Sequence, residues 1–294
     1  MYYRRKILLS LLQTFGGKLG KLELQKLLFL FVDKQASASF HFIPYKYGCY
    51  SFQANADLST LSKYGLVKES NKEWLLTTSE GYDALLIEED KKVLQNISDS
   101  FKSYSTNDLI IYVYKRYPYY AINSLVAEEK LSTVDYNKVK QLKPQINDPL
   151  LFTIGYEGIS VEEYFNKLIQ NDVKVLCDVR NFPRSMKYGF SKNQLKSICE
   201  GLGIKYVHLP GLGIVSTKRK KLETQEDYDN LFTEYRETTL INNSVDQKEI
   251  SRLISQNKRV AITCFESNIH QCHRFHLANA LNTNGNGSFI LKHI

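Results

Sequence analysis

Residues 150–158 read LLFTIGYEG, an apolar run that ends in small, aromatic and acidic residues. The same change from apolar to polar recurs in KVLCDVR at 174–180, IKYVHLP at 204–210 and RVAITCFE at 259–266. Segments with helical apolar spacing separate these runs. Short apolar strands alternating with amphipathic helices are typical of a parallel sheet that carries helices on its faces.

This alternation predicts a Rossmann-like α/β fold for the second half of the chain. The expected strands are Leu150–Ile154, Val173–Val179, Ile204–Leu209, Arg259–Phe265 and a final one at Gly287–His293. The expected helices are Ser160–Gln170, Lys192–Leu202, Glu226–Ile241, Lys248–Gln256 and Cys272–Leu281.

The polar clusters of this half follow the strands. In open parallel sheets, ligands bind in the crevice beyond the carboxyl ends of the strands. We therefore expect one polar cleft there. Its candidate catalytic residues are Asp178, Glu266, Glu157 and Cys272, and its candidate substrate-binding residues are Gly155, Tyr156, Arg180, Pro183, Arg184, Ser185, His208, His273 and Arg274.

These residue types suggest a phosphorylated, ribose-bearing substrate. Carboxylates act as acid, base or nucleophile, and pairs of them suit glycosidic bond cleavage. Arginines bind phosphate bidentately, and a helix that begins near His273 adds its positive end. Tyr156 could stack on a base, and the loop Lys218–Lys221 could hold a phosphate backbone. Two alternatives stay open: Asp178 and Arg180 could form a structural ion pair, and Glu266 could only cap its loop.

The five cysteines carry no CxxC pair. Their odd number and wide spacing indicate reduced thiols, with Cys177 and Cys264 in the core and Cys272 better placed as a nucleophile. Cysteines, histidines and Glu266 crowd into residues 264–276, but His273 and His276 stand three apart instead of the usual four. We therefore assign no metal ligands, and the sequence identifies no cofactor.

The first half is expected to be mainly helical. Helices are predicted over Arg5–Phe15, Lys21–Gln35 and Ser51–Tyr64, followed by a hairpin of Leu66–Glu69 and Glu73–Thr77. That order is winged-helix-like. Phe40–Tyr50 is expected to be a strand or extended arm, and further helices are predicted over Gly81–Ile97 and Thr106–Lys115.

The predicted organisation is a winged-helix-like domain over residues 1–130, a linker over 131–149 and the α/β domain over 150–294. Two prolines, several lysines and Asn147-Asp148-Pro149 mark the linker.

The charge and the apolar content of the sequence bear on its binding partners and its location in the cell. The formal net charge is +8, and 20 basic against 16 acidic residues up to Leu150 leave an equal share for each half. A diffuse basic surface permits contact with nucleic acid without requiring it. No run approaches the roughly 20 apolar residues of a membrane span, and no signal peptide is evident. We expect a cytoplasmic protein with no membrane partner.

Two resemblances add to this interpretation. Thr153–Gly158, Asp178-Val179-Arg180 with Pro183 and Ser185, Tyr206–Pro210, Cys264-Phe265-Glu266 and Cys272-His273-Arg274 resemble the prokaryotic family known as domain of unknown function 488. The resemblance runs from about Leu151 to Leu281 and implies an α/β fold but no established reaction. The family's usual acidic residue after His-Leu-Pro is replaced here by Gly211.

In the first half, Lys21–Phe31, Pro44–Ser51 and Asp57–Val67 resemble a Panacea or SocA-type antitoxin-like domain. That resemblance implies binding to DNA or to a protein partner, whereas the alternative is a helical accessory domain that only packs. The preferred hypothesis is an enzyme that hydrolyses a glycosidic or phosphate-ester bond of nucleic acid or a nucleotide, in prokaryotic defence or nucleic-acid maintenance. The alternatives are a non-catalytic nucleotide- or DNA-binding sensor and a transferase that uses the Cys272 thiol.

Overall fold

The structure is a computed structural model that describes residues 1–78, 81–219, 222–285 and 288–294. The chain divides into two compact units, Met1–Lys143 and Pro144–Ile294. Each unit is described by itself. In the described residues, no helix combines the length and the apolar character needed to cross a membrane.

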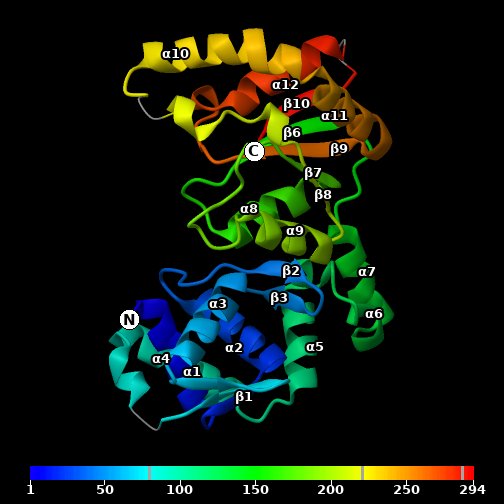
Figure 1. The fold of residues 1–294 in the computed structure, drawn as a ribbon. Coiled ribbons are helices and arrows are strands. Elements are labelled where there is room, and N and C mark those ends of the chain that lie inside the picture. Colours follow the sequence, from blue (N-terminus) through cyan, green and yellow to red (C-terminus); the bar gives the residue numbers. More distant parts are fainter. Residues whose placement is uncertain (79–80, 220–221, 286–287) are drawn as a thin grey trace. The chain divides into compact units, whose positions relative to one another are not determined.

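The N-terminal unit begins with helices around a small antiparallel sheet (Figure 1). The strand order is β1-β5-β4, and β4 and β5 form the predicted hairpin. Apart from a second hairpin between α2 and α3, the succession of helix, strand, two helices and hairpin is winged-helix-like, as predicted. The elements are α1 (Tyr3–Thr14), β1 (Lys18–Gly20), α2 (Lys21–Lys34), α3 (Phe52–Lys63), β4 (Val67–Glu69) and β5 (Glu73–Leu76).

A second hairpin, β2 (Ile43–Tyr45) with β3 (Gly48–Tyr50), forms the segment expected to be a strand or an arm. It covers the buried side chain of Lys26, whose amine donates to the carbonyls of Tyr47 and Cys49 at 2.6 and 3.3 Å. Burial lowers the pKa of Lys26. The two carbonyls replace hydrogen bonds to water that the amine loses on burial. Lys26 is therefore part of the packing of this unit.

The rest of this unit differs in two places from the prediction. The expected helix over 81–97 is a 3₁₀ turn at Tyr82–Leu85 followed by α4 (Glu88–Phe101), because Leu86 and Ile87 are extended. The expected linker contains α7 (Thr133–Leu142), which the Ser132 hydroxyl caps. The remaining elements are α5 (Thr106–Arg116), a 3₁₀ turn at Pro118–Ala121 and α6 (Ala127–Lys130).

The C-terminal unit is built on a five-stranded parallel sheet in the order β10-β6-β9-β7-β8. All five predicted strands are present, and β9 lies at the centre. The strands are β6 (Leu150–Gly155), β7 (Val175–Asp178), β8 (Lys205–His208), β9 (Arg259–Cys264) and β10 (Ile290–His293). The predicted mixed α/β class, with helices at the N-terminus, is confirmed.

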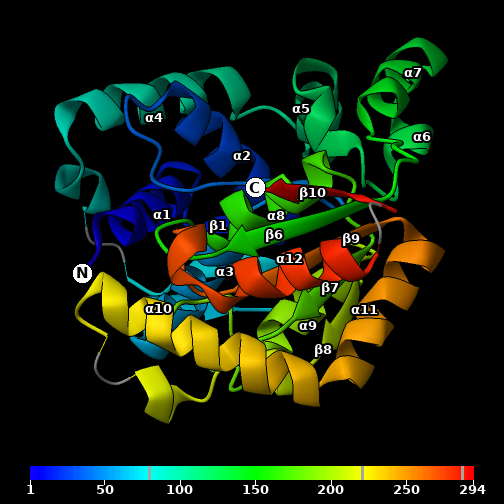
Figure 2. The same cartoon turned by 90° about the horizontal axis from the view of Figure 1, so that it is seen from above.

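Helices cover both faces of this sheet. Figure 1 shows α8 and α9 on one side of it, and α11 and α12 on the other. Seen from above, α10 runs alongside α12 and extends the second layer (Figure 2). The bounds are α8 (Val161–Gln170), α9 (Lys192–Gly201), α10 (Gln225–Glu234), a π-helical continuation (Tyr235–Leu240), α11 (Ser244–Asn257) and α12 (His273–Asn284).

The core of this unit lies between the sheet and the helices. Val175, Cys177, Val260 and Ile262 are fully buried in β7 and β9, under residues such as Leu253 of α11. Because the central strands are covered on both faces, their sequences are almost continuously apolar. The charged side chains of these central strands therefore lie at the strand ends, and the candidate site lies at the carboxyl ends.

Candidate functional site

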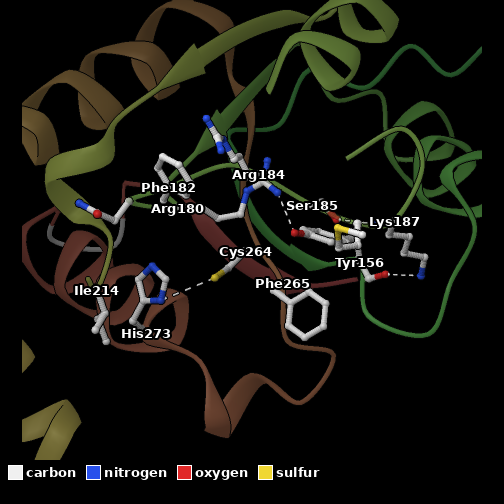
Figure 3. A pocket seen from close by; sticks show the side chains of 12 residues that line it. Tyr156, Arg180, Phe182, Arg184, Ser185, Lys187, Ile214, Cys264, Phe265 and His273 are labelled. Atoms are coloured by element: carbon white, nitrogen blue, oxygen red, sulfur yellow. Dashed lines mark hydrogen bonds between the residues drawn. The ribbon is translucent and has the colours of Figure 1, made fainter. Parts of the chain in front are cut away.

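A cavity of about 490 Å³ opens beyond the carboxyl ends of β6, β7 and β9 (Figure 3). It collects side chains from the segments that follow four strands, β6, β7, β8 and β9. The lining residues are Tyr156, Arg180, Asn181, Phe182, Arg184, Ser185, Met186, Lys187, Ile214, Cys264, Phe265 and His273. The cavity therefore lies at the edge of the sheet that the strand-end pattern indicates.

Asp178, at the end of β7, is fully buried and does not line the cavity. Its Oδ2 accepts from Nη2 of Arg180 at 2.6 Å and from the Tyr206 hydroxyl at 2.7 Å, and its Oδ1 accepts from Nε of Arg180 at 2.8 Å. Burial and then the carboxylate raise the pKa of Tyr206 above its ordinary value. This geometry is that of the structural ion pair that the sequence left open for Asp178.

Arg180 is the partner in that pair, and most of its donors are used inside the protein. Its Nη1 donates to the Tyr156 hydroxyl at 2.7 Å and to the carbonyl of Phe190 at 2.9 Å. Burial by itself would lower the pKa of Arg180, but the hydrogen bonds and charge of Asp178 outweigh it and raise that pKa. Arg180 thus holds the cavity wall in place and offers little of its guanidinium to a ligand.

Two other cations face the cavity more openly. The Arg184 guanidinium is exposed and lies 4.9 Å from the centre of the Phe182 ring. In the described residues it makes no ion pair. The Lys187 amine is half-buried and donates to the carbonyl of Tyr156 at 2.8 Å, and desolvation lowers its pKa. Both side chains lie where they could contact an anion.

Aromatic rings form the rest of the wall. Tyr156 is buried and stacks on Phe190 at 4.2 Å between ring centres, and burial raises its pKa. Phe182 and Phe265 are 64 and 44% exposed, which is high for side chains of this size. Phe182 and Phe265 therefore expose more of their surface to a ligand than does the buried Tyr156, for which the sequence suggested stacking on a base.

Arg274 does not reach the cavity. Its guanidinium is buried and donates to the carbonyls of Glu266 and Ser267, in the loop after β9. That loop packs so tightly on β6 that a Cβ placed on Gly155 would lie 1.9 Å from the Glu266 carbonyl oxygen. Gly155 and Arg274 therefore fix the loop, and the expectation that Arg274 binds an anion is not met by this geometry.

The other two predicted carboxylates also lie off the cavity wall. Glu157 accepts from the backbone N–H and the hydroxyl of Ser267 at 2.9 and 3.0 Å, and these hydrogen bonds lower its pKa. Glu266 accepts from the Cys264 thiol at 3.1 Å. The described wall of the cavity contains no carboxylate.

Cys264 and His273 form the end of the cavity nearest to α12 (Figure 3). The Cys264 Sγ lies 3.6 Å from Nδ1 of His273 and the Cys272 Sγ lies 4.0 Å from the same nitrogen. Cys272 is fully buried away from the cavity, and burial raises the pKa of its thiol well above the ordinary value. Cys264 is buried, as expected for a core thiol, and it is also the cysteine that lines the cavity.

Of the remaining predicted residues, Ser185 lines the cavity and Pro183 and His208 lie outside its wall. Ser185 lines the cavity and its hydroxyl accepts from the Lys187 N–H, whereas Pro183 is buried beside it. Nε2 of His208 donates to the Arg180 carbonyl at 3.0 Å, and His208 does not line the cavity. In the basic loop after β8, Lys220 and Lys221 lie outside the described residues.

Several wall residues were not identified from the sequence, namely Asn181, Phe182, Met186, Lys187, Ile214 and Phe265. Phe265 is the last residue of a predicted strand and Phe182 lies three residues beyond another, so the strand-end rule that selected Arg180 and Glu266 could have included them. Ile214 carries no such signal, because an apolar side chain in a loop is also typical of packing.

Comparison with known proteins covers part of the chain. A family model described as Domain of unknown function DUF488 matches residues 160–281. The matched segment runs from the start of α8 into α12 and so contains most of the cavity wall. No curated protein matches the chain. The match begins after the N-terminal unit, and the antitoxin-like resemblance of that unit stays a prediction.

Proposed function

We propose that the C-terminal unit binds a nucleotide, free or within nucleic acid, and hydrolyses one of its phosphate-ester or glycosidic bonds. The observation that carries the proposal is the wall of the cavity, which combines open cations with exposed aromatic rings and no carboxylate in the described residues. Its volume of about 490 Å³ lies within the range of roughly 300–1,000 Å³ for small-molecule sites.

Arg184 and Lys187 would hold the phosphate. Arginine offers a planar pair of N–H donors that matches two phosphate oxygens, and lysine adds a point charge. Because the Asp178–Arg180 pair is nearly neutral, these two side chains leave the cavity with a net positive charge. An anion bound there would also favour the charged form of Lys187 that burial disfavours.

Phe182 and Phe265 would hold the base. Stacking of a base on an aromatic side chain is worth about 1–3 kcal/mol and tolerates any base, because each base has a π-face. The Arg184 guanidinium already lies over the Phe182 ring, so a phosphate and a base could be held side by side. This arrangement favours a nucleotide over a simple sugar phosphate.

The reaction is assigned to the end of the cavity formed by Cys264 and His273. A thiol and an imidazole can both take part in hydrolysis, either directly or by holding a metal ion that activates water. The sequence assigned catalysis to three carboxylates that lie off the wall: Asp178 and Glu266 hydrogen-bond to the wall residues Arg180 and Cys264, whereas Glu157 bonds to Ser267. The hydrogen bond from Cys264 to Glu266 connects the reactive end to the carboxylates.

The test compares binding and turnover in two matched variants. We expect nucleotides or short oligonucleotides to raise the melting temperature of the protein and to be converted to product detectable by chromatography. Arg184→Gln should weaken binding about tenfold or more, the size of one charge-assisted hydrogen bond. Arg252→Gln, which removes an exposed arginine of α11 outside the cavity, should bind like the wild type. Equal affinity in both variants, or no stabilisation by any nucleotide or oligonucleotide tried, would contradict the proposal.

A second candidate is a sensor that binds the same ligand without converting it. The observation that favours it is that all three predicted catalytic carboxylates are held by internal hydrogen bonds. In a sensor, the winged-helix order of the N-terminal unit would provide contact with DNA or a protein partner through α3 and the β4–β5 hairpin. Stabilisation by a nucleotide with no product after prolonged incubation would select this candidate over the hydrolase.

A further inference from the structure

Three potential metal ligands converge at one part of the cavity wall. Cys264 ends β9, Cys272 precedes α12, and His273 is the first residue of that helix. Their two sulfur atoms and one ring nitrogen all lie within 4.8 Å of one another. All three side chains are buried. Since Cys264 is separated from the other two by a loop, only the folded chain brings the three together.

The hydrogen bonding of His273 orients its ring for metal binding. Its Nε2 lies 3.2 Å from the carbonyl oxygen of Val179. A carbonyl only accepts hydrogen bonds, so Nε2 carries the proton and Nδ1 presents its lone pair to the sulfur atoms of Cys264 and Cys272. Histidines that bind metals almost always donate their other N–H in this way to a carbonyl or a carboxylate.

The distances suit a tetrahedral zinc ion. Zinc lies about 2.3 Å from thiolate sulfur and about 2.0–2.1 Å from imidazole nitrogen, and tetrahedral angles then separate the ligand atoms by roughly 3.5 Å. The sulfur-to-nitrogen distances are 3.6 Å for Cys264 and 4.0 Å for Cys272. Small movements of these side chains would complete the coordination.

We propose that Cys264, Cys272 and His273 bind one zinc ion and leave its fourth coordination position facing the cavity. Cys264 and His273 both line the cavity, so a water or a ligand oxygen could reach the metal from that side. Three protein ligands with one open position are the pattern of catalytic zinc, whereas structural zinc usually has four protein ligands. The sequence alone did not identify this site, because its ligands form no CxxC pair and include neither His270 nor His276.

The experiment measures metal alone and does not depend on the nucleotide proposal. The full chain, purified in the presence of a reductant, should contain about one zinc per molecule by elemental analysis. After removal of the metal, cobalt(II) should restore the stoichiometry. It should produce the sulfur-to-cobalt charge-transfer band of thiolate ligation together with the intense visible bands of a tetrahedral site.

Variants then assign the ligands. Cys264→Ser and Cys272→Ser should each weaken zinc retention against a competing chelator by more than tenfold and reduce the charge-transfer band. Cys199→Ser, which changes a buried thiol of α9 outside the cluster, should retain zinc like the wild type. Circular dichroism of every variant checks the fold.

The proposal is overturned if the folded wild-type protein holds no stoichiometric zinc and gives no thiolate band with cobalt. It is also overturned if the Cys264 and Cys272 variants retain metal as well as the Cys199 variant does. The wild-type cobalt spectrum decides the question even if a variant fails to fold. A positive zinc result with no nucleotide binding would leave this site in place and remove only the proposed substrate.

Discussion

At the scale of single residues, the buried pair of Asp178 and Arg180 has the largest expected effect. Replacing Asp178 with Asn leaves the buried guanidinium without its counter-charge, and breaking a buried pair in this way costs about 3–5 kcal/mol. We therefore expect Asp178→Asn to lower the free energy of unfolding by an amount of that order. Urea unfolding followed by circular dichroism measures the change.

Tyr206→Phe is the matched variant for this prediction. It removes only the hydroxyl that donates to Asp178 at 2.7 Å, so the ion pair stays intact. We expect it to cost about 1.5–3 kcal/mol, the usual value for a hydrogen bond to a charged group. An Asp178→Asn protein as stable as the wild type but without turnover would instead return Asp178 to the catalytic role that the sequence suggested.

At the scale of secondary-structure elements, the close approach of β6 to the loop after β9 determines the shape of the cavity wall. Gly155→Ala would place a Cβ 1.9 Å from the Glu266 carbonyl oxygen and 2.7 Å from its carbonyl carbon. Backbone atoms cannot rotate away, so the strand and the loop must separate. We expect a loss of about 1–3 kcal/mol of stability, as for other overpacked sites, together with weaker ligand binding.

Gly203→Ala is the control, because Gly203 has a left-handed φ of 73° but no atom within 4 Å of the added Cβ. It should cost roughly 1–2 kcal/mol through backbone conformation alone. Denaturant unfolding and ligand titration of the two variants separate the effects. If Gly155→Ala binds ligand as tightly as Gly203→Ala does, the packing of β6 on the loop does not shape the cavity.

The helices and strands of the C-terminal unit were largely predictable because the spacing of apolar residues along the sequence follows which side chains are buried. Strands covered on both faces must be apolar throughout, and all five predicted strands are present. Helix α7 was not predicted although Ser132 caps it by accepting from the Asp135 N–H, because the prolines that follow it are typical of a linker. The start of α4 was misplaced although Glu88, Glu89 and Asp90 supply the acidic first turn of a helix.

The candidate site was predictable only in part. The rule for strand ends identifies the correct edge of the sheet, because it depends on topology alone. It cannot show which polar groups are already paired, and Asp178, Glu157 and Arg274 prove to be held by neighbours that are distant in sequence or in an adjacent loop. The proximity of Cys264 to Cys272 and His273 depends in the same way on the path of one loop.

At the scale of the whole molecule, the two units can be followed separately because the chain has a single tryptophan. Trp74 lies on β5 of the N-terminal unit and is 1% exposed, so its emission reports the unfolding of that unit. Each unit is compact and buries apolar side chains of its own. We therefore expect a ligand of the cavity to stabilise the C-terminal unit and to leave the Trp74 transition unchanged.

The size of this effect follows from mass action. A ligand present at one hundred times its dissociation constant adds about 2.7 kcal/mol to the stability of the unit that binds it. In urea unfolding followed by circular dichroism, the nucleotide should therefore move the transition of the C-terminal unit, which Trp74 emission does not report, to higher urea. Arg184→Gln should remove that shift. If the Trp74 transition moved equally with the ligand, the two units would unfold as one cooperative body. Ligand binding in the cavity would then also stabilise the N-terminal unit, and such coupling between the two units is what a sensor requires.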